Sequence, residues 1–384
     1  RLRPPFSCLS AWALAQSTSM PTPLRLEQLR RHALARSLFA PTTLPAALRR
    51  LGFVQADPLR APAKAQDLTL RHRVRDYRAG DLEQRYPALA VEEDFLVNYG
   101  FVPRQAQALL HPREPRHTWD DARWQQARAV HDFVRQRGVA HPREVDAHFD
   151  HGTVGNWFGG RTRASTELLD GLHYRGLLRV ARREGGTRLY AVRESSSPSQ
   201  EPVDPLVALD TLADLILQTY APLPAPGLNQ LLSLLLGGGV PQWRHLRAAT
   251  LQRAQARWPG AEVDGLRWYW PEGEDPARCR RHEPERVCLL APFDPVVWDR
   301  RRFELFWGWS YRFEAYVPAA QRQRGHYALP LLWRDQVIGW ANVKVAAGRL
   351  VPELGYVQQR PADPAFDQAL DAEFDRLHHF LGLG

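Results

Sequence analysis

The sequence contains very little lysine and very little cysteine. Lys64 and Lys344 are the lysines among its 51 basic residues. Its three cysteines, Cys8, Cys279 and Cys288, are too few and too unevenly spaced for a disulfide framework or a zinc site. The 14 histidines form no metal-binding spacing with acidic partners. We therefore expect a protein of a reducing compartment that uses no metal and no other cofactor.

Long apolar runs are also absent. The longest candidate, residues 231–236, is far shorter than the roughly 20 residues that a membrane span needs, which excludes an integral membrane protein. Methionine occurs once, at Met20. The basic and apolar residues before it imitate a secretory signal, with Ala13-Leu-Ala15 as the cleavage-like motif. The position of Met20 instead favours a disordered or non-native lead over residues 1–23.

The composition indicates a globular protein with a polyanionic partner. With 384 residues and 44% hydrophobic content, the chain is long enough for two to four domains with buried cores. The net charge is +9 and the pI is near 9.8. A GC-rich genome explains the preference for arginine over lysine equally well, but the excess positive charge favours nucleic acid as the partner. We expect a cytoplasmic, nucleoid-associated monomer with no membrane partner.

The pattern of helices and strands predicts an α+β protein with repeated units. Residues 24–117 contain helical periodicity on both sides of a short strand and are expected to form a winged-helix-like domain. Residues 118–197 show three helices followed by a hairpin with its turn at Gly185-Gly186, the order of a winged helix-turn-helix. Residues 198–285 repeat that order. Residues 286–384 are rich in short β-type runs, including one near 312–317, and predict a small C-terminal β-barrel with a closing helix.

A glutamine and an aspartate stand two residues apart in the segment Phe53-Val-Gln-Ala-Asp57, just before Pro58. If this segment is extended, Gln55 and Asp57 share one face of a strand, and Pro58 ends the pairing. An amide and a carboxylate placed in this way can hold one water for hydrolysis of a bond with a good leaving group. The two-residue motif alone is weak, since both residues also suit a capped turn.

The wider context resembles the AlkZ/YcaQ-like winged-helix DNA glycosylases, in particular the YcaQ-type branch with Gln-x-Asp. The resemblance runs through residues 54–73, 75–83, 164–178, 292–301 and 311–320 and covers nearly the whole chain from about residue 24. It includes the motif Pro-Phe-Asp-Pro-Val-Val-Trp-Asp-Arg-Arg at 292–301. The resemblance implies tandem winged helices followed by a β-barrel, arranged around duplex DNA.

The resemblance also implies a site and an activity. Gln55 and Asp57 match the catalytic positions, with Gln55 orienting a water and Asp57 acting as base and electrostatic partner. The implied reaction is hydrolysis of the N-glycosidic bond of N7-alkylated guanine, with unhooking of interstrand crosslinks as an extension. The implied partner is double-stranded DNA that carries alkylated or crosslinked guanine. The scarcity of lysine favours a monofunctional enzyme that uses water, because a lyase needs an amine nucleophile.

Basic and aromatic residues near these segments are candidate DNA contacts. The candidates are Arg60, Lys64, Arg71, Arg73, Trp157, Arg161 and Arg163. Each also fits a solvated surface or a packed core. Two other functions stay open at this point: a non-catalytic winged-helix transcription regulator, and a nuclease. The regulator has no need of Gln55 and Asp57, and the nuclease needs a carboxylate cluster for metal that the chain does not supply convincingly.

Overall fold

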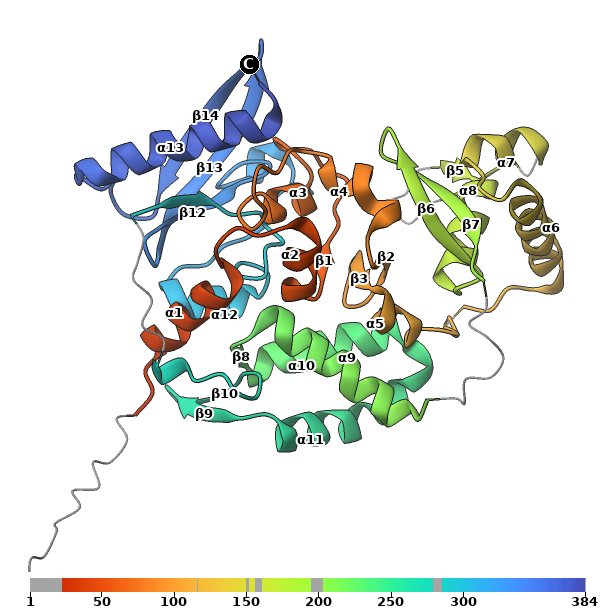
Figure 1. Cartoon of the computed structure of the whole chain (residues 1–384), viewed down its shortest axis with the longest axis horizontal. Coiled ribbons are helices and arrows are strands. Elements are labelled where there is room, and N and C mark those ends of the chain that lie inside the picture. The colour runs from red at the N-terminus through yellow and green to blue at the C-terminus, as the bar shows by residue number, and fades with distance from the viewer. Residues whose placement is uncertain are drawn as a thin grey trace, which may run out of the picture.

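The computed structural model describes residues 23–115, 117–149, 152–155, 161–194, 203–278 and 285–383. These residues form helices and small antiparallel sheets, so the predicted mixture of α and β structure is confirmed (Figure 1). The predicted lead over residues 1–23 lies outside the described residues except for residue 23. Trp157 also lies outside them. No described helix is long and apolar enough to cross a membrane.

The first segment carries the Gln-x-Asp motif at the end of a very short strand. Its elements are α1 (Leu26–Ser37), α2 (Leu44–Leu51), β1 (Val54–Gln55), α3 (Ala65–Leu70), α4 (Asp81–Arg85), a 3-10 turn (Tyr86–Ala88), β2 (Val91–Phe95), β3 (Tyr99–Pro103) and α5 (Arg104–Ala108). The strands pair antiparallel in the order β1-β3-β2, with Gln55 opposite Gly100. A Cβ on Gly100 would lie 2.4 Å from the carbonyl oxygen of Val54, so this close pairing requires glycine.

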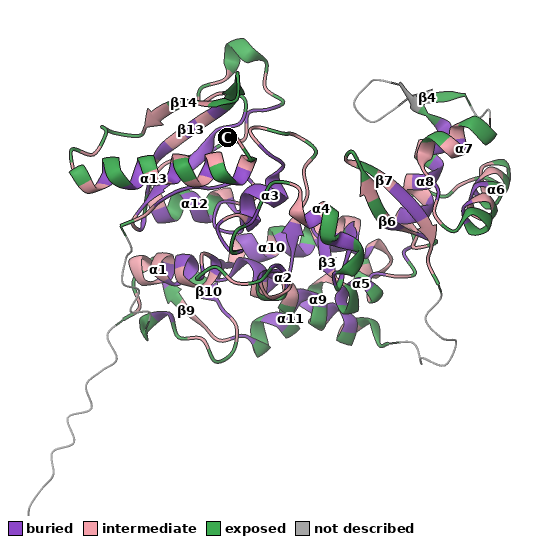
Figure 2. Ribbon diagram, turned by 45° about the horizontal axis from the view of Figure 1, so that its top comes forward, coloured by how far each residue is buried: buried purple, intermediate pink, exposed green. Residues whose placement is uncertain are grey.

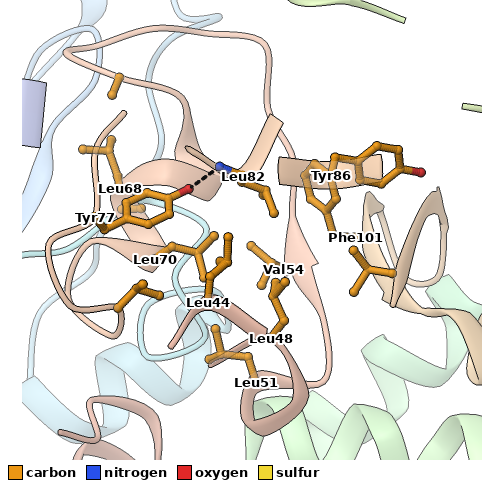
Figure 3. Close-up of a cluster of buried hydrophobic side chains, with 14 of the residues drawn as sticks. Leu44, Leu48, Leu51, Val54, Leu68, Leu70, Tyr77, Leu82, Tyr86 and Phe101 are labelled. Atoms are coloured by element: carbon orange, nitrogen blue, oxygen red, sulfur yellow. Dashed lines mark hydrogen bonds between the residues drawn. The ribbon is translucent and has the colours of Figure 1, made fainter. Parts of the chain in front are cut away.

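Apolar side chains behind β1 hold the motif-bearing strand in place. Figure 3 shows α2, β1, α3 and the start of α4 contributing to one buried cluster. The hydroxyl of Tyr77 in this cluster accepts a hydrogen bond from the backbone N–H of Leu82 (3.2 Å). Because Val54 is 2% exposed, the strand that ends at Gln55 is anchored in the core rather than lying loose on the surface.

The second segment has the predicted three helices and hairpin. Its elements are α6 (Asp121–Arg137), α7 (Pro142–His148), β4 (Thr153–Gly155), β5 (Arg161–Arg163), α8 (Ala164–Tyr174), β6 (Leu178–Glu184) and β7 (Thr187–Val192). Asp120 caps α6 by accepting a hydrogen bond from the N–H of Arg123 (2.8 Å). Gly185 and Gly186 have φ of 55° and 88°, which the tight turn between β6 and β7 requires.

The third segment repeats this order, as predicted for it. Its elements are α9 (Pro205–Tyr220), β8 (Leu223–Pro224), α10 (Ala225–Leu234), a π-helical turn (Leu235–Gly239), 3-10 turns (Pro241–Leu246, Pro276–Arg278), α11 (Arg247–Arg257), β9 (Gly260–Val263) and β10 (Leu266–Tyr269). The outer faces of α6 and α11 are exposed (Figure 2), whereas α10 has one buried face that carries Gly227, Leu228, Leu231 and Leu232.

One strand topology recurs in all three segments. A short strand, which follows α2 in the first segment and α9 in the third, pairs with the last strand of a later hairpin, giving the orders β1-β3-β2 and β8-β10-β9. In the second segment the short strand is reduced to a bridge between Ala140 and Tyr190 of β7. The Gln-x-Asp motif therefore occupies the end of the first strand of the first repeat.

The predicted C-terminal barrel is wrong. The described residues there are β11 (Val287–Leu289), α12 (Arg300–Trp307), a 3-10 turn (Ala319–Gln321), β12 (Leu329–Trp333), β13 (Gln336–Ala346), β14 (Arg349–Tyr356) and α13 (Pro364–Leu381). The strands form an open sheet in the order β11-β12-β13-β14, and its two edge strands do not pair. The predicted run at 312–317 is not a strand. The closing helix α13 contacts both edge strands and covers the sheet instead (Figure 1).

Hydrophobic clusters cross the predicted domain limits, and two of them are the largest in the described chain. One cluster joins residues of 39–101 with residues of 127–190 and 287–380. The other joins Leu29, Phe53, Leu96 and Val97 to the third segment. The first segment thus packs against each of the other three, and the site described next lies where they meet.

Candidate active site

Gln55 and Asp57 lie at the end of β1 and in the loop that follows it. The strand ends at Gln55, earlier than the predicted extended segment, although the N–H of Ala56 still bonds to the carbonyl of Tyr99 (3.0 Å). The position of Asp57 is therefore set by the loop after β1 and not by the alternation of side chains along a strand. Its backbone N–H donates to Oε1 of Gln66 (3.2 Å), and its Oδ1 accepts from the N–H of Leu59 (2.9 Å).

The amide of Gln55 is held by two distant residues. Its Oε1 accepts a hydrogen bond from the indole Nε1 of Trp298 (2.9 Å) and another from Nδ2 of Asn98 (3.2 Å). Trp298 belongs to the 292–301 motif, whose role the sequence left open. Asn98 lies in the turn between β2 and β3, which no local sequence pattern predicts. Both residues were missed as members of the site.

The carboxylate of Asp57 is half-buried and has no cationic partner among the described residues. Burial raises the pKa of Asp57 above its usual range, opposed by the hydrogen bond from the Leu59 N–H. Burial, followed by the negative charge of Asp57, also raises the pKa of Tyr327. The hydroxyl of Tyr327 is buried without a hydrogen-bond partner among the described residues. An uncompensated carboxylate in such a place is suited to meet a positive charge on a ligand.

A cavity of about 700 Å³ opens beside Asp57, between the first segment and the hairpin of the second. Its lining includes Asp57, Arg60, Lys64, Tyr99, Arg183 and Arg188. Asp170 lines the cavity as well. Lys64, Arg183 and Arg188 are paired with Glu83, Glu93 and Asp170, so Arg60 is the lining cation that has no ion pair among the described residues. Cationic groups of this kind attract phosphates, and aromatic rings accept bases by stacking.

Paired charges hold the β6–β7 hairpin against this cavity. Arg179 forms two hydrogen bonds to Glu92 (3.1 and 2.8 Å), and Arg183 forms two to Glu93 (2.8 and 2.5 Å). Both glutamates lie on β2 and are buried. A Cβ on Gly186, at the hairpin tip, would lie 3.3 Å from Nζ of Lys64, so the tip is seated directly beside the motif loop.

The structure separates the predicted DNA contacts into different classes. Arg60 is exposed and lines the cavity, and Arg163 is exposed with an ion pair to Asp146 (3.2 Å). Arg161 lies in β5. Lys64 also lines the cavity, but it is buried and its ammonium pairs with Glu83.

Arg71 and Arg73 lie inside the protein, which argues against the predicted contacts with DNA. The guanidinium of Arg71 bonds to Glu373 of α13 and to the carbonyl of Leu289 (3.1 Å). Arg73 is 0% exposed and forms a two-point ion pair with Asp294 (2.8 and 2.9 Å). Both arginines join the first segment to the C-terminal region, where each is already paired with a buried carboxylate.

A second carboxylate near the loop supports a prediction about stability. Asp67 on α3 is 3% exposed, and burial raises its pKa to about 6, although the Tyr77 hydroxyl donates to it (2.7 Å). A raised folded-state pKa means that stability is fully present below the unfolded pKa and is lost as pH rises through about 6. We expect Asp67→Asn to raise the melting temperature at about pH 8, with a gain of at most about 3 kcal/mol that vanishes below about pH 4.

Thermal melts across this pH range measure the effect. Asp371→Asn is a matched control, because Asp371 is an exposed carboxylate on α13 and should change little at either end of the range. A lower melting temperature for Asp67→Asn at the alkaline end would contradict the expected direction.

A protein-family model and a solved structure both match this chain over most of its length. The family model "DNA glycosylase AlkZ-like" matches residues 48–380, which includes Gln55, Asp57 and Trp298. The chain belongs to the AlkZ-like DNA glycosylase family. The solved structure of the Streptomyces sahachiroi DNA glycosylase AlkZ is similar, with a TM-score of 0.59 and 14% sequence identity. The match covers 94% of this chain and 98% of that one, so the two proteins share one fold over nearly their whole length.

The AlkZ-like family membership confirms the predicted enzyme class. A DNA glycosylase cleaves the bond between a base and its deoxyribose, so the site must reach the sugar of a nucleotide in DNA. The predicted resemblance to this family is confirmed as well. The alternative of a non-catalytic regulator is not supported, since the matched family consists of enzymes.

Proposed function

We propose that this AlkZ-like glycosylase hydrolyses the N-glycosidic bond of N7-alkylated guanine in double-stranded DNA. We extend the proposal to crosslinks that join the two strands through such guanines. The observation that carries it is the half-buried carboxylate of Asp57, which has no cationic partner in the described chain and borders a cavity with a basic wall. Alkylation at N7 supplies the missing positive charge, first on the base and then on the sugar.

The proposed chemistry needs little acid catalysis. As the C1′–N9 bond breaks, its electron pair moves into the cationic base, which leaves as neutral alkylguanine. The sugar develops oxocarbenium character, which the carboxylate of Asp57 stabilises electrostatically. A water oxygen then bonds to C1′, and Asp57 takes the proton that this water loses. Gln55 positions that water.

The repeated segments supply the proposed DNA-binding frame. We infer that the three segments with the shared strand order are winged helices, and that the first has become the catalytic unit. Its hairpin turn is buried, with Leu96 at 0% and Val97 at 5% exposure, so it does not reach into a groove. The exposed Arg60 and Arg163 of the first two segments are the proposed phosphate contacts.

The direct test uses metal-free protein and duplex DNA that carries one 7-methylguanine. Release of free 7-methylguanine with formation of abasic sites is expected. A second duplex with a crosslink between N7 positions tests the extension, through appearance of separated strands after alkali. Failure to act on either duplex, with activity on another damaged base, would refute the proposed substrate class and leave the glycosylase family intact.

We expect no covalent enzyme–DNA adduct during turnover. The ammonium of Lys64 is buried and paired with Glu83, and Lys344 lies exposed on β13 where it pairs with Glu353 (3.3 Å). Neither lysine is placed as a free amine nucleophile. Borohydride added during the reaction should therefore trap nothing, and the abasic product should break only with alkali or heat. An adduct that disappears in Lys64→Ala would instead show a lyase.

A further inference from the structure

The carbonyl end of the Gln55 amide is fully occupied, and the nitrogen end is not. Oε1 accepts from Trp298 and from Asn98, whereas Nε2 has no hydrogen bond to any described residue. An indole N–H can only donate, so its bond identifies the Gln55 atom that it meets as the oxygen. The two donors therefore fix the amide in one of its two possible orientations.

Both donors are themselves held rigidly. The ring of Trp298 packs against Tyr220 with a centroid distance of 5.1 Å, and Tyr220 is 1% exposed. On either side of Trp298 in the motif, Asp294 pairs with the buried Arg73, and Asp299 caps α12 through the N–H groups of Arg301 and Arg302 (3.1 and 3.0 Å). The aspartates of the motif at 292–301 thus hold the backbone on both sides of Trp298 in place.

Asn98 is fixed from the opposite side. Its carbonyl accepts a hydrogen bond from the N–H of Leu96 (3.1 Å) in the β2–β3 turn. Leu96 and Val97 pack into the same cluster as Leu235 and Leu236 of the third segment. Gln55 is consequently held between Trp298 of the C-terminal part and Asn98 of its own segment, and the turn that carries Asn98 packs on the third segment.

We propose that Trp298, with Asn98, is a positioning residue that sets Gln55 as a hydrogen-bond donor to the attacking water. This inference rests on the proposed function of Gln55 and Asp57. With Oε1 occupied, Gln55 offers N–H to the water oxygen and cannot accept the water's proton. Asp57 is then left as the acceptor of that proton. The opposite amide orientation would offer the water a second proton acceptor beside Asp57 and would remove the donor to its oxygen.

The hydrogen bond can be tested without any activity. In protein labelled with ¹⁵N-tryptophan, the indole resonance that disappears in Trp298→Phe is that of Trp298. We expect this resonance to move upfield in Gln55→Ala, because its acceptor is lost, while the indole resonance of Trp309 stays in place. Trp309 is a suitable reference, since its Nε1 donates to the carbonyl of Val337 (2.9 Å) away from the site. An unmoved Trp298 resonance would overturn the proposed contact.

The role in turnover is tested by a double-mutant cycle on the 7-methylguanine duplex. Trp298→Phe keeps the ring packing and removes the N–H, and should lower the single-turnover rate by about tenfold with little change in DNA affinity. In a Gln55→Ala background the same change should have almost no effect, because Trp298 acts through Gln55. Trp309→Phe, which removes an equivalent indole bond elsewhere, should leave the rate unchanged.

The outcomes separate this inference from the proposed function. Equal losses from Trp298→Phe in both backgrounds, or no loss in either, would refute the positioning role while leaving Asp57 as the base. A wild-type rate for Gln55→Ala itself would refute the assignment of the catalytic pair. If the methylguanine duplex is not a substrate, the resonance shift still decides whether Trp298 holds Gln55.

Discussion

Replacing Asp57 by asparagine is expected to slow base release by about two to four orders of magnitude and to leave DNA affinity almost unchanged. Asparagine has nearly the same shape, but it carries no charge to stabilise the developing oxocarbenium ion and cannot take a proton from water. Since Asp57 forms no ion pair with any described residue, its substitution breaks no charge pair. Single-turnover release of 7-methylguanine and a binding titration measure the two quantities.

The same variant should not be less stable than the wild type at neutral pH. Burial raises the pKa of Asp57, so the charged carboxylate lowers the stability of the folded protein. The wild type is therefore most stable below the unfolded-state pKa of Asp57 and loses stability as pH rises through the folded-state pKa. Removing that charge relieves the cost. Wild-type activity should rise with pH through the raised pKa of Asp57, and the acidic limb should be absent from the residual activity of Asp57→Asn. A wild-type rate of base release in Asp57→Asn would refute the proposed mechanism.

Gln55→Ala should cost less than Asp57→Asn, because a neutral amide orients water but does not compensate a positive charge. The two variants differ in this way only if the roles are divided as the hydrogen bonds of Gln55 suggest. An equal or larger loss at Gln55 would reverse the assignment of roles.

The helices and hairpins of the second and third segments were predictable because their signals are local. Helical periodicity, the Asp120 cap and the Gly185-Gly186 turn all act within a few residues of the element that they define. The same holds for α13 and for the turns between the C-terminal strands. Such features give the order of elements, and the order in turn located the strand on which Gln55 stands.

The β2–β3 hairpin could not be predicted, and the reason is its buried charge. Glu92, Glu93 and Asp94 lie in succession on β2 and are each at most 3% exposed. A run of acidic residues ordinarily indicates a solvated surface. Here Arg179 and Arg183 of the second segment neutralise the two glutamates, and Arg113 bonds to Asp94 (3.0 Å). The partners are far apart in sequence, so no local pattern announces the strand.

Only two of the four residues of the candidate site could be identified from the sequence, because the other two contact Gln55 from distant parts of the chain. Gln55 and Asp57 were identified by their motif and its family resemblance, whereas Asn98 and Trp298 reach Gln55 across 43 and 243 residues of sequence. The barrel prediction failed because alternating strands indicate a sheet but do not say whether its edges meet. In this chain α13 packs across the open sheet, which removes the need for closure.

The sequence does not distinguish an arginine that contacts DNA phosphate from one that pairs with a buried aspartate. We expect Arg73→Met to lower the free energy of unfolding by about 3–5 kcal/mol, because it leaves the buried carboxylate of Asp294 without its partner. The double variant Arg73→Met with Asp294→Asn should recover part of that loss, because no unpaired charge remains. Urea denaturation of the three proteins measures these differences.

Arg60→Ala should give the opposite pattern. Arg60 is exposed on the cavity rim and has no ion pair among the described residues, so stability should change by less than about 0.5 kcal/mol. DNA binding should weaken, and the slope of log affinity against log salt should fall by about one counterion, because one phosphate contact is lost. For Arg73→Met, measured where the protein is still folded, that slope should stay unchanged. A reduced salt slope for Arg73→Met with normal stability would show that Arg73 reaches DNA after all, and would contradict the packing of its guanidinium against Asp294.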